Sequence, residues 1–260
     1  MNILDILVES TRKRYEERRK NLSINELKAK VASLEKGEPK LYELCKKKDF
    51  IYICECKKAS PSKGLIEPNY HPEIQSKLYI EAGADCISCL TEPTKFLGND
   101  DHLKMVIDNA KGKALVLRKD FVCSKYQIYE SKLLGADIIL LICAILDKKT
   151  LKEYLDLAHS LGLSCLVETH NEEEIEKAKV CGAVVVGVNN RNLKDFTVDN
   201  SLSLRLREKY PELFLISESG VKSIDDVKAI KNAKLNGVLM GEVLMRSGDP
   251  KKTLEEFKKC

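Results

Sequence analysis

The sequence predicts an α/β protein built as a single (β/α)8 TIM barrel, and three observations lead to that prediction. First, a chain of 260 residues is long enough for eight strand-helix units. Second, short and almost continuously apolar runs alternate strictly with longer stretches of helical pattern, which is typical of a parallel sheet covered by helices. Third, a glycine-containing step recurs roughly every fifty residues, an interval that fits two strand-helix units and gives four stacked quarters.

The recurring step precedes every second apolar run. Its four copies are Gly83-Ala84, Gly135-Ala136, Gly182-Ala183 and Asn236-Gly237. Each glycine is expected to end a helix, because glycine readily takes the left-handed conformation that closes a helix. The chain would then enter the second, fourth, sixth and eighth strands of the barrel.

The apolar runs and the periodic stretches between them give the expected elements. The strands are Phe50 to Cys54, Cys86 to Leu90, Ala114 to Leu117, Ile138 to Ile142, Ser164 to Val167, Val184 to Val188, Leu213 to Ile216 and Val238 to Met240. The helices are Pro72 to Ala82, Asp101 to Ala110, Ser124 to Leu134, Lys149 to Leu161, Glu172 to Val180, Asn200 to Tyr210, Ser223 to Ala233 and Pro250 to Lys258.

Residues 1–47 precede the first strand and read as a helical N-terminal extension, with the barrel over residues 48–260. Asp5 to Lys20 has an amphipathic helical pattern, and Ser23 with Glu26 has the form of a capping box before a second helix. We expect this extension to cover one end of the barrel.

The rival architecture for the whole chain is a doubly wound open sheet. Such a sheet would carry a GxGxxG phosphate loop after its first strand, and that motif does not follow Cys54.

Charge and composition restrict the function classes. The 44 basic and 40 acidic residues nearly cancel, so bulk charge gives no case for a nucleic-acid or membrane partner. The sequence has no apolar stretch of membrane-spanning length and no secretory leader pattern, which favours the cytoplasm. An anionic small molecule remains a possible ligand.

The cysteines and histidines do not predict a metal centre. The ten cysteines are scattered through apolar runs, as expected of reduced thiols that pack as small hydrophobic groups. Cys86 and Cys89 form a CxxC, but they lie three apart in an expected strand and so face opposite sides of it. The four histidines show no metal-ligand spacing. We expect no metal and no disulfide.

The first expected strand leads directly into polar residues. Since alternate side chains share one face of a strand, Glu55 and Lys57 point one way and Cys54 and Cys56 the other. If the first pair faces the inside of the barrel, an acid and an ammonium group stand together beside the polar loop that contains Ser60. The carboxyl ends of the strands are where barrel enzymes place their active sites.

Potential acids, bases and anion binders follow four further strands. One such residue usually only marks the start of a loop, whereas five strands ending this way indicate an active site. The further residues are Lys119, Glu168, Asn189, Arg191, Glu218 and Ser219.

Two late loops have features of a phosphate site. Glu218 to Val221 opens the seventh strand-helix connection, and Met240 to Glu242 opens the eighth, where a short helical turn can begin at Val243. Glycine lets backbone N–H groups approach a phosphate, and barrels commonly bind phosphate at this pair of loops. The sequence therefore predicts a phosphorylated substrate.

Seven segments together resemble the indole-3-glycerol-phosphate synthases of tryptophan biosynthesis. They occur in order, and the similarity runs from about Ile3 to Lys258. The segments are ECKKASPSKG from 55, LTEPTKFLG from 90, LRKDF from 117, VET from 167, GVNNRNL from 187, SESGV from 217 and MGEVLMR from 240. The resemblance implies a single barrel whose helical extension covers the catalytic end.

The reaction implied by the resemblance closes the pyrrole ring of 1-(2-carboxyphenylamino)-1-deoxyribulose 5-phosphate, with loss of carbon dioxide and water. It requires no cofactor. Lys119 would be the general acid that activates the ribulose carbonyl, and Glu168 the second proton-transfer residue, which assists dehydration. Lys57 would pair with the substrate carboxylate or phosphate and is a second candidate for proton transfer. Glu55 and Asn189 would orient these groups.

The remaining site residues are also assigned by resemblance. Arg191 and Glu218 would position and neutralise neighbouring groups, and Ser60 would belong to the substrate-binding loop. The phosphate cradle would be Ser219, Gly220, Gly241 and Glu242, and the apolar slot for the anthranilate ring would be Phe96, Phe121, Leu140 and Ile142.

Other functions and assembly states fit parts of the pattern. A phosphosugar isomerase or epimerase, a Schiff-base aldolase that uses Lys119 or Lys57, and a non-catalytic phosphate-binding barrel are the alternatives. A metal-dependent epimerase would need His and Asp ligands at strand ends. The expected protein is a monofunctional lyase, either monomeric or associated with other enzymes of the tryptophan pathway.

Overall fold

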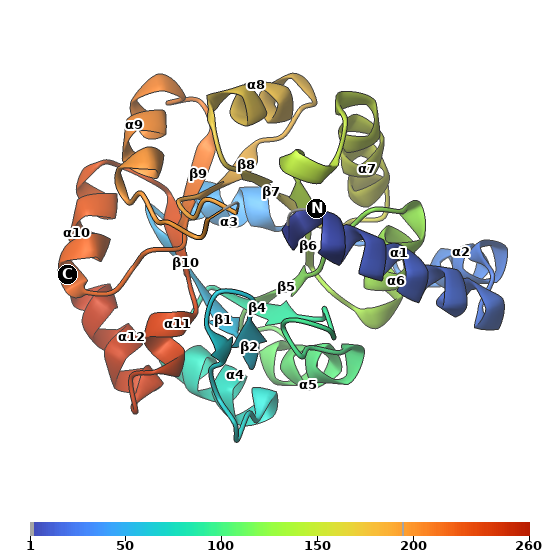
Figure 1. Ribbon diagram of the computed structural model, residues 1–260, viewed down its shortest axis with the longest axis horizontal. Helices are drawn as coiled ribbons and strands as arrows, with labels where there is room; N and C mark the ends of the chain where they lie inside the picture. The colour runs from blue at the N-terminus through green and yellow to red at the C-terminus, as the bar shows by residue number, and fades with distance from the viewer. Residues whose placement is uncertain (1–2, 194) are drawn as a thin grey trace.

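The computed structural model describes residues 3–193 and 195–260, and within them eight parallel strands close into a barrel (Figure 1). The order around the barrel is β1-β10-β9-β8-β7-β6-β5-β4, and β4 pairs with β1 to complete the ring. The predicted (β/α)8 barrel is therefore confirmed. Its strands are β1 (Ile51–Cys56), β4 (Cys86–Leu90), β5 (Leu115–Lys119), β6 (Ile138–Ile142), β7 (Ser164–Thr169), β8 (Val185–Asn189), β9 (Phe214–Glu218) and β10 (Gly237–Met240).

Helices surround this ring on the outside. Those that follow β1 are α4 (Pro72–Glu81), α5 (Asp100–Ala110), α6 (Lys125–Leu134), α7 (Lys148–Ser160), α8 (Glu172–Val180), α9 (Ser201–Lys209), α10 (Ile224–Asn232), α11 (Glu242–Met245) and α12 (Pro250–Lys259). A 3-10 turn, η1 (Cys143–Ile145), follows β6. The expected helix over each of these segments is present, and the expected turn after Gly241 is α11.

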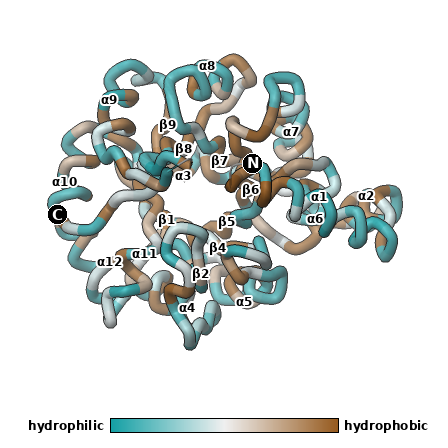
Figure 2. The backbone as a smooth tube through the Cα atoms, viewed as in Figure 1, coloured by the Kyte–Doolittle hydropathy of each residue, from teal (hydrophilic) through white to brown (hydrophobic). Residues whose placement is uncertain are grey.

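Strand periodicity sorts the apolar residues into two cores. Ile51 and Ile53 belong to the core inside the barrel, whereas Tyr52 and Cys54 belong to the larger core between strands and helices. Figure 2 shows the apolar strands gathered at the centre and hydrophilic segments on the outer helices. Every strand residue from Ile138 to Ile142 is buried, as two covered faces require.

The CxxC prediction is confirmed by the same alternation. Cys86 lies in the inner core and Cys89 in the outer core, so their side chains leave β4 on opposite faces. All the cysteines in the described ranges are free thiols. In those ranges, no group of three or more His, Cys, Asp or Glu side chains is arranged to hold a metal ion.

The glycine repeat ends helices as predicted in three copies out of four. Gly83, Gly135 and Gly182 have φ values of 80°, 91° and 91° just after α4, α6 and α8. The fourth prediction is wrong, because Gly237 is the first residue of β10 and Lys234 takes the left-handed conformation after α10, with φ 60°. Gly237 is instead required by packing, since a Cβ there would lie 2.5 Å from the Ile51 carbonyl oxygen.

The residues before β1 form three helices with different contacts. The first helix, α1 (Ile3–Asn21), places Leu7 in the inner core and contributes its first turns to a cavity at the carboxyl ends of the strands. The second helix, α2 (Ile24–Ala32), begins with the predicted Ser23–Glu26 capping box and packs on α6.

The third helix, α3 (Leu41–Lys47), lies at the opposite end of the barrel. Its Leu41 and Cys45 pack with Ile51 and Cys86, the first inward-facing residues of β1 and β4. The Leu41 backbone N–H donates to the Ser164 hydroxyl at the start of β7, 3.0 Å away.

The polar segment after β1 forms a small hairpin that was expected only as a loop. Ala59–Ser60 (β2) pairs antiparallel with Gly64–Leu65 (β3). Backbone N–H groups of Ile66 and Glu67 both donate to the Lys58 carbonyl, which fixes the base of the hairpin. Among the helices described, none is both long and apolar enough to cross a membrane.

Candidate active site

A cavity of about 700 Å³ opens at the carboxyl ends of the barrel strands. All eight barrel strands, the hairpin, the first turns of α1 and the loops after β4, β5, β8, β9 and β10 contribute to its wall. All the site residues predicted from the sequence lie in this wall: Glu55, Lys57, Ser60, Phe96, Lys119, Phe121, Leu140, Ile142, Glu168, Asn189, Arg191, Glu218, Ser219, Gly220, Gly241 and Glu242.

Lys119 is the charge at the centre of this cavity. Its Nζ lies 3.2 Å from Glu168 Oε2 and 3.1 Å from Glu218 Oε2. Burial alone would lower the pKa of Lys119, but the carboxylates of Glu218, Glu168 and Glu55 outweigh it and raise the pKa above its usual range. Lys119 is therefore a charged ammonium group, able to donate a proton or a hydrogen bond to a carbonyl oxygen.

A second ammonium group is paired with an acid on β1. Lys57 Nζ donates to Glu55 Oε1 over 2.6 Å, and the Ser88 hydroxyl lies 3.5 Å from Glu55 Oε2. Burial would raise the pKa of Glu55, yet the Lys57 and Lys119 ammonium groups hold it below its usual value. Glu55 is thus ionised and keeps Lys57 turned toward the cavity.

Glu168 is held from two sides as well as by Lys119. The Asn189 amide donates to Glu168 Oε1 over 3.3 Å, and His170 Nε2 lies 3.2 Å from the same oxygen. That histidine distance suits an ion pair, although the N–H is not aligned for a good hydrogen bond. Burial opposes ionisation of Glu168, but Lys119 and His170 lower its pKa below the usual range.

Glu218 is the carboxyl group with the opposite shift. Burial is the main cause, and the nearby carboxylates of Glu168 and Glu55 add to it, so the pKa of Glu218 rises to about 7 despite Lys119. Its Oε1 is buried without a hydrogen-bond partner. Near neutral pH this group therefore exists in both protonation states and can accept or donate a hydrogen bond.

The loop after β9 is shaped by backbone conformation. Ser219 has φ 64° and Gly220 has φ 93°, and a non-glycine residue in the left-handed region is strained. The Ser219 hydroxyl donates to Asn189 Oδ1 over 2.8 Å, and the Asn190 amide donates to the Ser219 carbonyl over 3.2 Å. These bonds hold the strained turn at the rim of the cavity.

The loop after β10 brings a second glycine close to the charged pair on β1. A Cβ on Gly241 would lie 3.2 Å from Lys57 Nζ and 2.9 Å from Glu55 Oε1. The next residue, Glu242, turns its carboxylate toward Lys63 of the hairpin at 3.5 Å and Arg246 at 3.4 Å. Gly241 therefore lets the backbone of this loop approach the Glu55–Lys57 pair more closely than a residue with a side chain could.

The apolar part of the wall is provided by rings and strand residues. Phe96 and Phe121 lie with ring centroids 6.1 Å apart and a 39° tilt. Leu140 and Ile142 project from β6 beside them, and Ile3 and Leu4 of α1 complete this side. An aromatic ring can be accepted here while its polar substituents reach Lys119 and Lys57.

Sequence reasoning missed two features next to this site. His170 follows Glu168 by two residues, a spacing that places both side chains on one face of an extended chain and could have indicated their contact. The second feature is Arg14, which reaches Asp120, the residue after Lys119, with distances of 2.8 and 2.7 Å to the two carboxylate oxygens. For Arg14 no local sequence signal exists.

Comparison with known proteins agrees with this geometry. The family model described as indole-3-glycerol phosphate synthase matches residues 4–257. The indole-3-glycerol phosphate synthase of Ruminiclostridium cellulolyticum is 49% identical over 250 residues, 95% of each chain. That of Endomicrobium trichonymphae is 44% identical over 269 residues, which cover 98% of this chain and 99% of the relative.

Solved structures with low sequence identity share the barrel. A thiamine phosphate pyrophosphorylase from Pyrococcus furiosus has a TM-score of 0.63 at 16% identity, covering 83% of this chain and 96% of that one. KGPDC from Streptococcus mutans has a TM-score of 0.60 at 12% identity, covering 80% of this chain and 95% of that one. These two similarities concern the fold alone. The family match over nearly the whole length and the near-complete coverage of close relatives lead to one conclusion: the chain belongs to the indole-3-glycerol phosphate synthase family.

Proposed function

We propose that this protein converts 1-(2-carboxyphenylamino)-1-deoxyribulose 5-phosphate to indole-3-glycerol phosphate in tryptophan biosynthesis. The observation that supports this most strongly is the charged centre, in which the Lys119 ammonium group faces three buried carboxyl groups in a cavity with one apolar side. Such a preorganised donor favours the step in which a carbonyl oxygen gains charge. The enzyme is a carboxy-lyase that acts on a phosphorylated small molecule.

Charge balance defines what the site must supply. The aromatic carbon that carries the carboxylate attacks the ribulose carbonyl carbon, the carboxylate leaves as neutral carbon dioxide, and the former carbonyl oxygen leaves as water. The substrate thus loses one negative charge, so each turnover takes up one proton. The site must protonate oxygen and also remove a C–H proton to complete the pyrrole ring.

The proposed roles follow from the positions of the charges. Lys119 donates the proton that activates the carbonyl, and Glu168, kept ionised beside it, accepts the C–H proton during dehydration. Glu55 and Asn189 orient Lys57 and Glu168 respectively. Lys57 binds the substrate carboxylate or phosphate, and its proximity to Gly241 supports the phosphate.

The binding roles complete the proposal. Arg191 and Glu218 position and neutralise neighbouring groups. The turn at Ser219 and Gly220, with Gly241 and Glu242, forms the phosphate cradle, and Ser60 contributes from the hairpin. The apolar side holds the anthranilate ring and consists of Phe96, Phe121, Leu140 and Ile142.

The raised pKa of Lys119 counts against the Schiff-base alternative. An amine nucleophile must be neutral, which requires a lysine with a lowered pKa. Burial would lower the pKa of Lys119, but the carboxylates of Glu218 and Glu168 outweigh it and raise the pKa. Absence of borohydride trapping in the presence of substrate is the result expected.

The test of the proposed function is the appearance of indole fluorescence when purified protein is mixed with the carboxyphenylamino substrate in EDTA. We expect indole product from the wild type. Lys119→Ala should lower kcat by on the order of 10²- to 10⁴-fold or more, the range typical of a lost proton-transfer group. Lys113→Ala, an exposed lysine that precedes β5, is the matched control. A folded wild type that makes no indole would contradict the proposal.

We also propose that residues 1–47 form an extension whose first helix covers the catalytic end of the barrel of residues 48–260. Ile3, Leu4 and Leu7 in the cavity wall support this assignment. A cytoplasmic location is supported by the free thiols, which suit a reducing compartment. A monomer suffices for the activity, because one chain provides every proposed site residue.

A further inference from the structure

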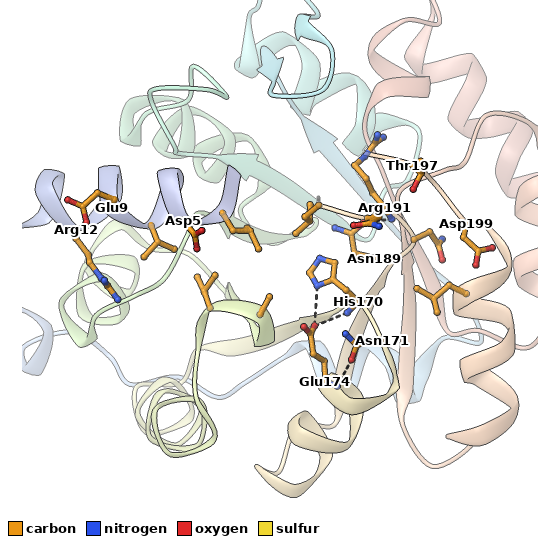
Figure 3. A pocket seen from close by; sticks show the side chains of 18 residues that line it. Asp5, Glu9, Arg12, His170, Asn171, Glu174, Asn189, Arg191, Thr197 and Asp199 are labelled. Carbon is orange, nitrogen blue, oxygen red and sulfur yellow. Dashed lines mark hydrogen bonds and ion pairs between the residues drawn. The ribbon is translucent and has the colours of Figure 1, made fainter. Parts of the chain in front are cut away.

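A second cavity, of about 910 Å³, lies beside the active site, and Figure 3 shows His170 among the side chains that line it. Asn189 and Arg191 line both cavities, whereas His170 and Glu174 line only the second. The His170 ring connects the two sites, because its Nε2 lies 3.2 Å from Glu168 Oε1 and its Nδ1 lies 3.1 Å from Glu174 Oε2.

Local structure fixes this histidine firmly. Glu174 stands in the first turn of α8, where its backbone N–H donates to Asn171 Oδ1 over 2.9 Å. The Glu174 carboxylate also accepts the backbone N–H of His170 over 2.9 Å. Glu174 therefore holds both the backbone and the ring of His170, and the ring cannot turn without losing its contact with the Glu174 carboxylate.

Charges on the other walls of the second cavity nearly balance. Helix α1 contributes Asp5, Glu9 and Arg12, and the β8–α9 loop contributes Arg191 and Asp199. None of these appears among the main causes of the His170 shift, which are burial, Glu168 and Glu174. The two flanking carboxylates raise the pKa of His170 to about 10 although burial opposes the charge.

We propose that His170 is a positioning residue: clamped by Glu174, its imidazolium holds the Glu168 carboxylate ionised and directs the second carboxylate oxygen toward the reacting C–H bond. The inference deepens the proposed function and rests on it. In the dehydration step the C–H bond breaks, its electron pair forms the ring double bond, and the proton goes to Glu168. The C–O bond breaks at the same stage, and the oxygen leaves as water after protonation by an ammonium group.

The positioning role has a specific kinetic consequence. Without the imidazolium, Glu168 keeps Lys119 and Asn189 but loses one of the charges that keep it ionised. The pKa of Glu168 should therefore rise. As the pH is lowered, Glu168 should then become protonated, and unable to accept a proton, at a higher pH than in the wild type. Substrate binding should change little, since His170 does not line the substrate cavity.

The first test compares His170→Gln, Glu174→Gln and the wild type in kcat and KM across pH. We expect His170→Gln to lower kcat by on the order of tenfold, to change KM by less than about twofold, and to move the acidic limb of kcat upward by about one pH unit. Glu174→Gln should move the same limb in the same direction by less. Glu172→Gln, which removes an exposed acid from the same helical turn, is the control and should change none of these.

The second test separates charge from packing. In His170→Ala, imidazole can enter through the second cavity and should restore both kcat and the position of the acidic limb. Pyrazole has the same size but remains uncharged, so it should restore neither. Equal rescue by the two compounds would show that His170 only fills space and would overturn the inference.

The outcomes distinguish this inference from the proposed function. An inactive, folded wild type removes the proposed function and the positioning role with it. An active wild type with an unmoved acidic limb in His170→Gln overturns the positioning role alone. A nitrogen-15 NMR titration of wild-type His170 gives an answer without substrate: an imidazolium that persists above pH 8 supports the inference, and a neutral ring at pH 7 overturns it.

Discussion

Gly187 has no side chain, and this leaves room for the Glu218 carboxylate in the active site. A Cβ at this position would overlap Glu218 Oε1 and would lie 2.9 Å from Glu218 Cδ. Gly187 sits in β8, next to β9, and its backbone is in an ordinary strand conformation, so alanine there would not strain the chain itself. The glycine is required by the position of the Glu218 carboxylate.

Gly187→Ala should therefore act through Glu218. We expect a lower kcat, because the displaced carboxylate can no longer meet Lys119, and a loss of about 1–3 kcal/mol in the free energy of unfolding from overpacking. The measurement is a double-mutant cycle with Glu218→Ala, in kinetics and in urea unfolding. In the Glu218→Ala background the added methyl group should change kcat and the free energy of unfolding little. Equal costs in both backgrounds would show that Gly187 has a different role.

Helix α1 is connected to the end of β5 by the ion pair between Arg14 and Asp120. The Arg14 guanidinium binds both oxygens of Asp120 and also donates to the Thr91 carbonyl over 3.1 Å. Burial would raise the pKa of Asp120, but Arg14 and Arg118 hold it below its usual range. Since Asp120 follows Lys119 directly, this pair ties the helix that covers the cavity to the end of the catalytic strand.

Arg14→Gln should weaken that connection. Asp120 is 1% exposed, and loss of one partner of a buried pair costs about 3 kcal/mol, partly offset here by Arg118 at 3.9 Å. We also expect a higher KM, because Ile3 and Leu4 of α1 line the substrate cavity. Urea unfolding and steady-state kinetics measure the two effects. Lys13→Gln, on the exposed side of α1, is the control, and an Arg14→Gln protein as stable as that control would contradict the prediction.

At the scale of the whole molecule, pH links the site to the stability of the fold. His170 has a pKa of about 10 in the folded protein and about 6.5 in an unfolded chain. Between these values the folded state holds a proton that the unfolded state has released. The free energy of unfolding contributed by His170 is therefore complete below about pH 6.5 and falls as pH rises toward 10.

The wild type should accordingly lose its stability advantage over His170→Gln as pH rises from 6.5 to 10. Other groups that titrate in this range are common to both proteins and largely cancel in the comparison. The measurement is urea unfolding of both proteins at several pH values. If the difference in free energy of unfolding between the two proteins stays constant across this range, His170 has the same protonation in the folded and unfolded states.

The sequence by itself determined the barrel, because the apolar period of strands and helices is a local property and every expected strand formed. Alternation along β1 likewise determined that Glu55 and Lys57 share the inner face, and the family motifs selected the residues that the cavity brings together. Tertiary structure alone decided which charges meet. Lys119 and Glu218 are on β5 and β9, strands that do not pair, and they lie 3.1 Å apart only because the sheet closes and directs both side chains inward. The pKa of about 7 for Glu218 has the same origin, since burial and charge at this side chain are set by residues distant in sequence.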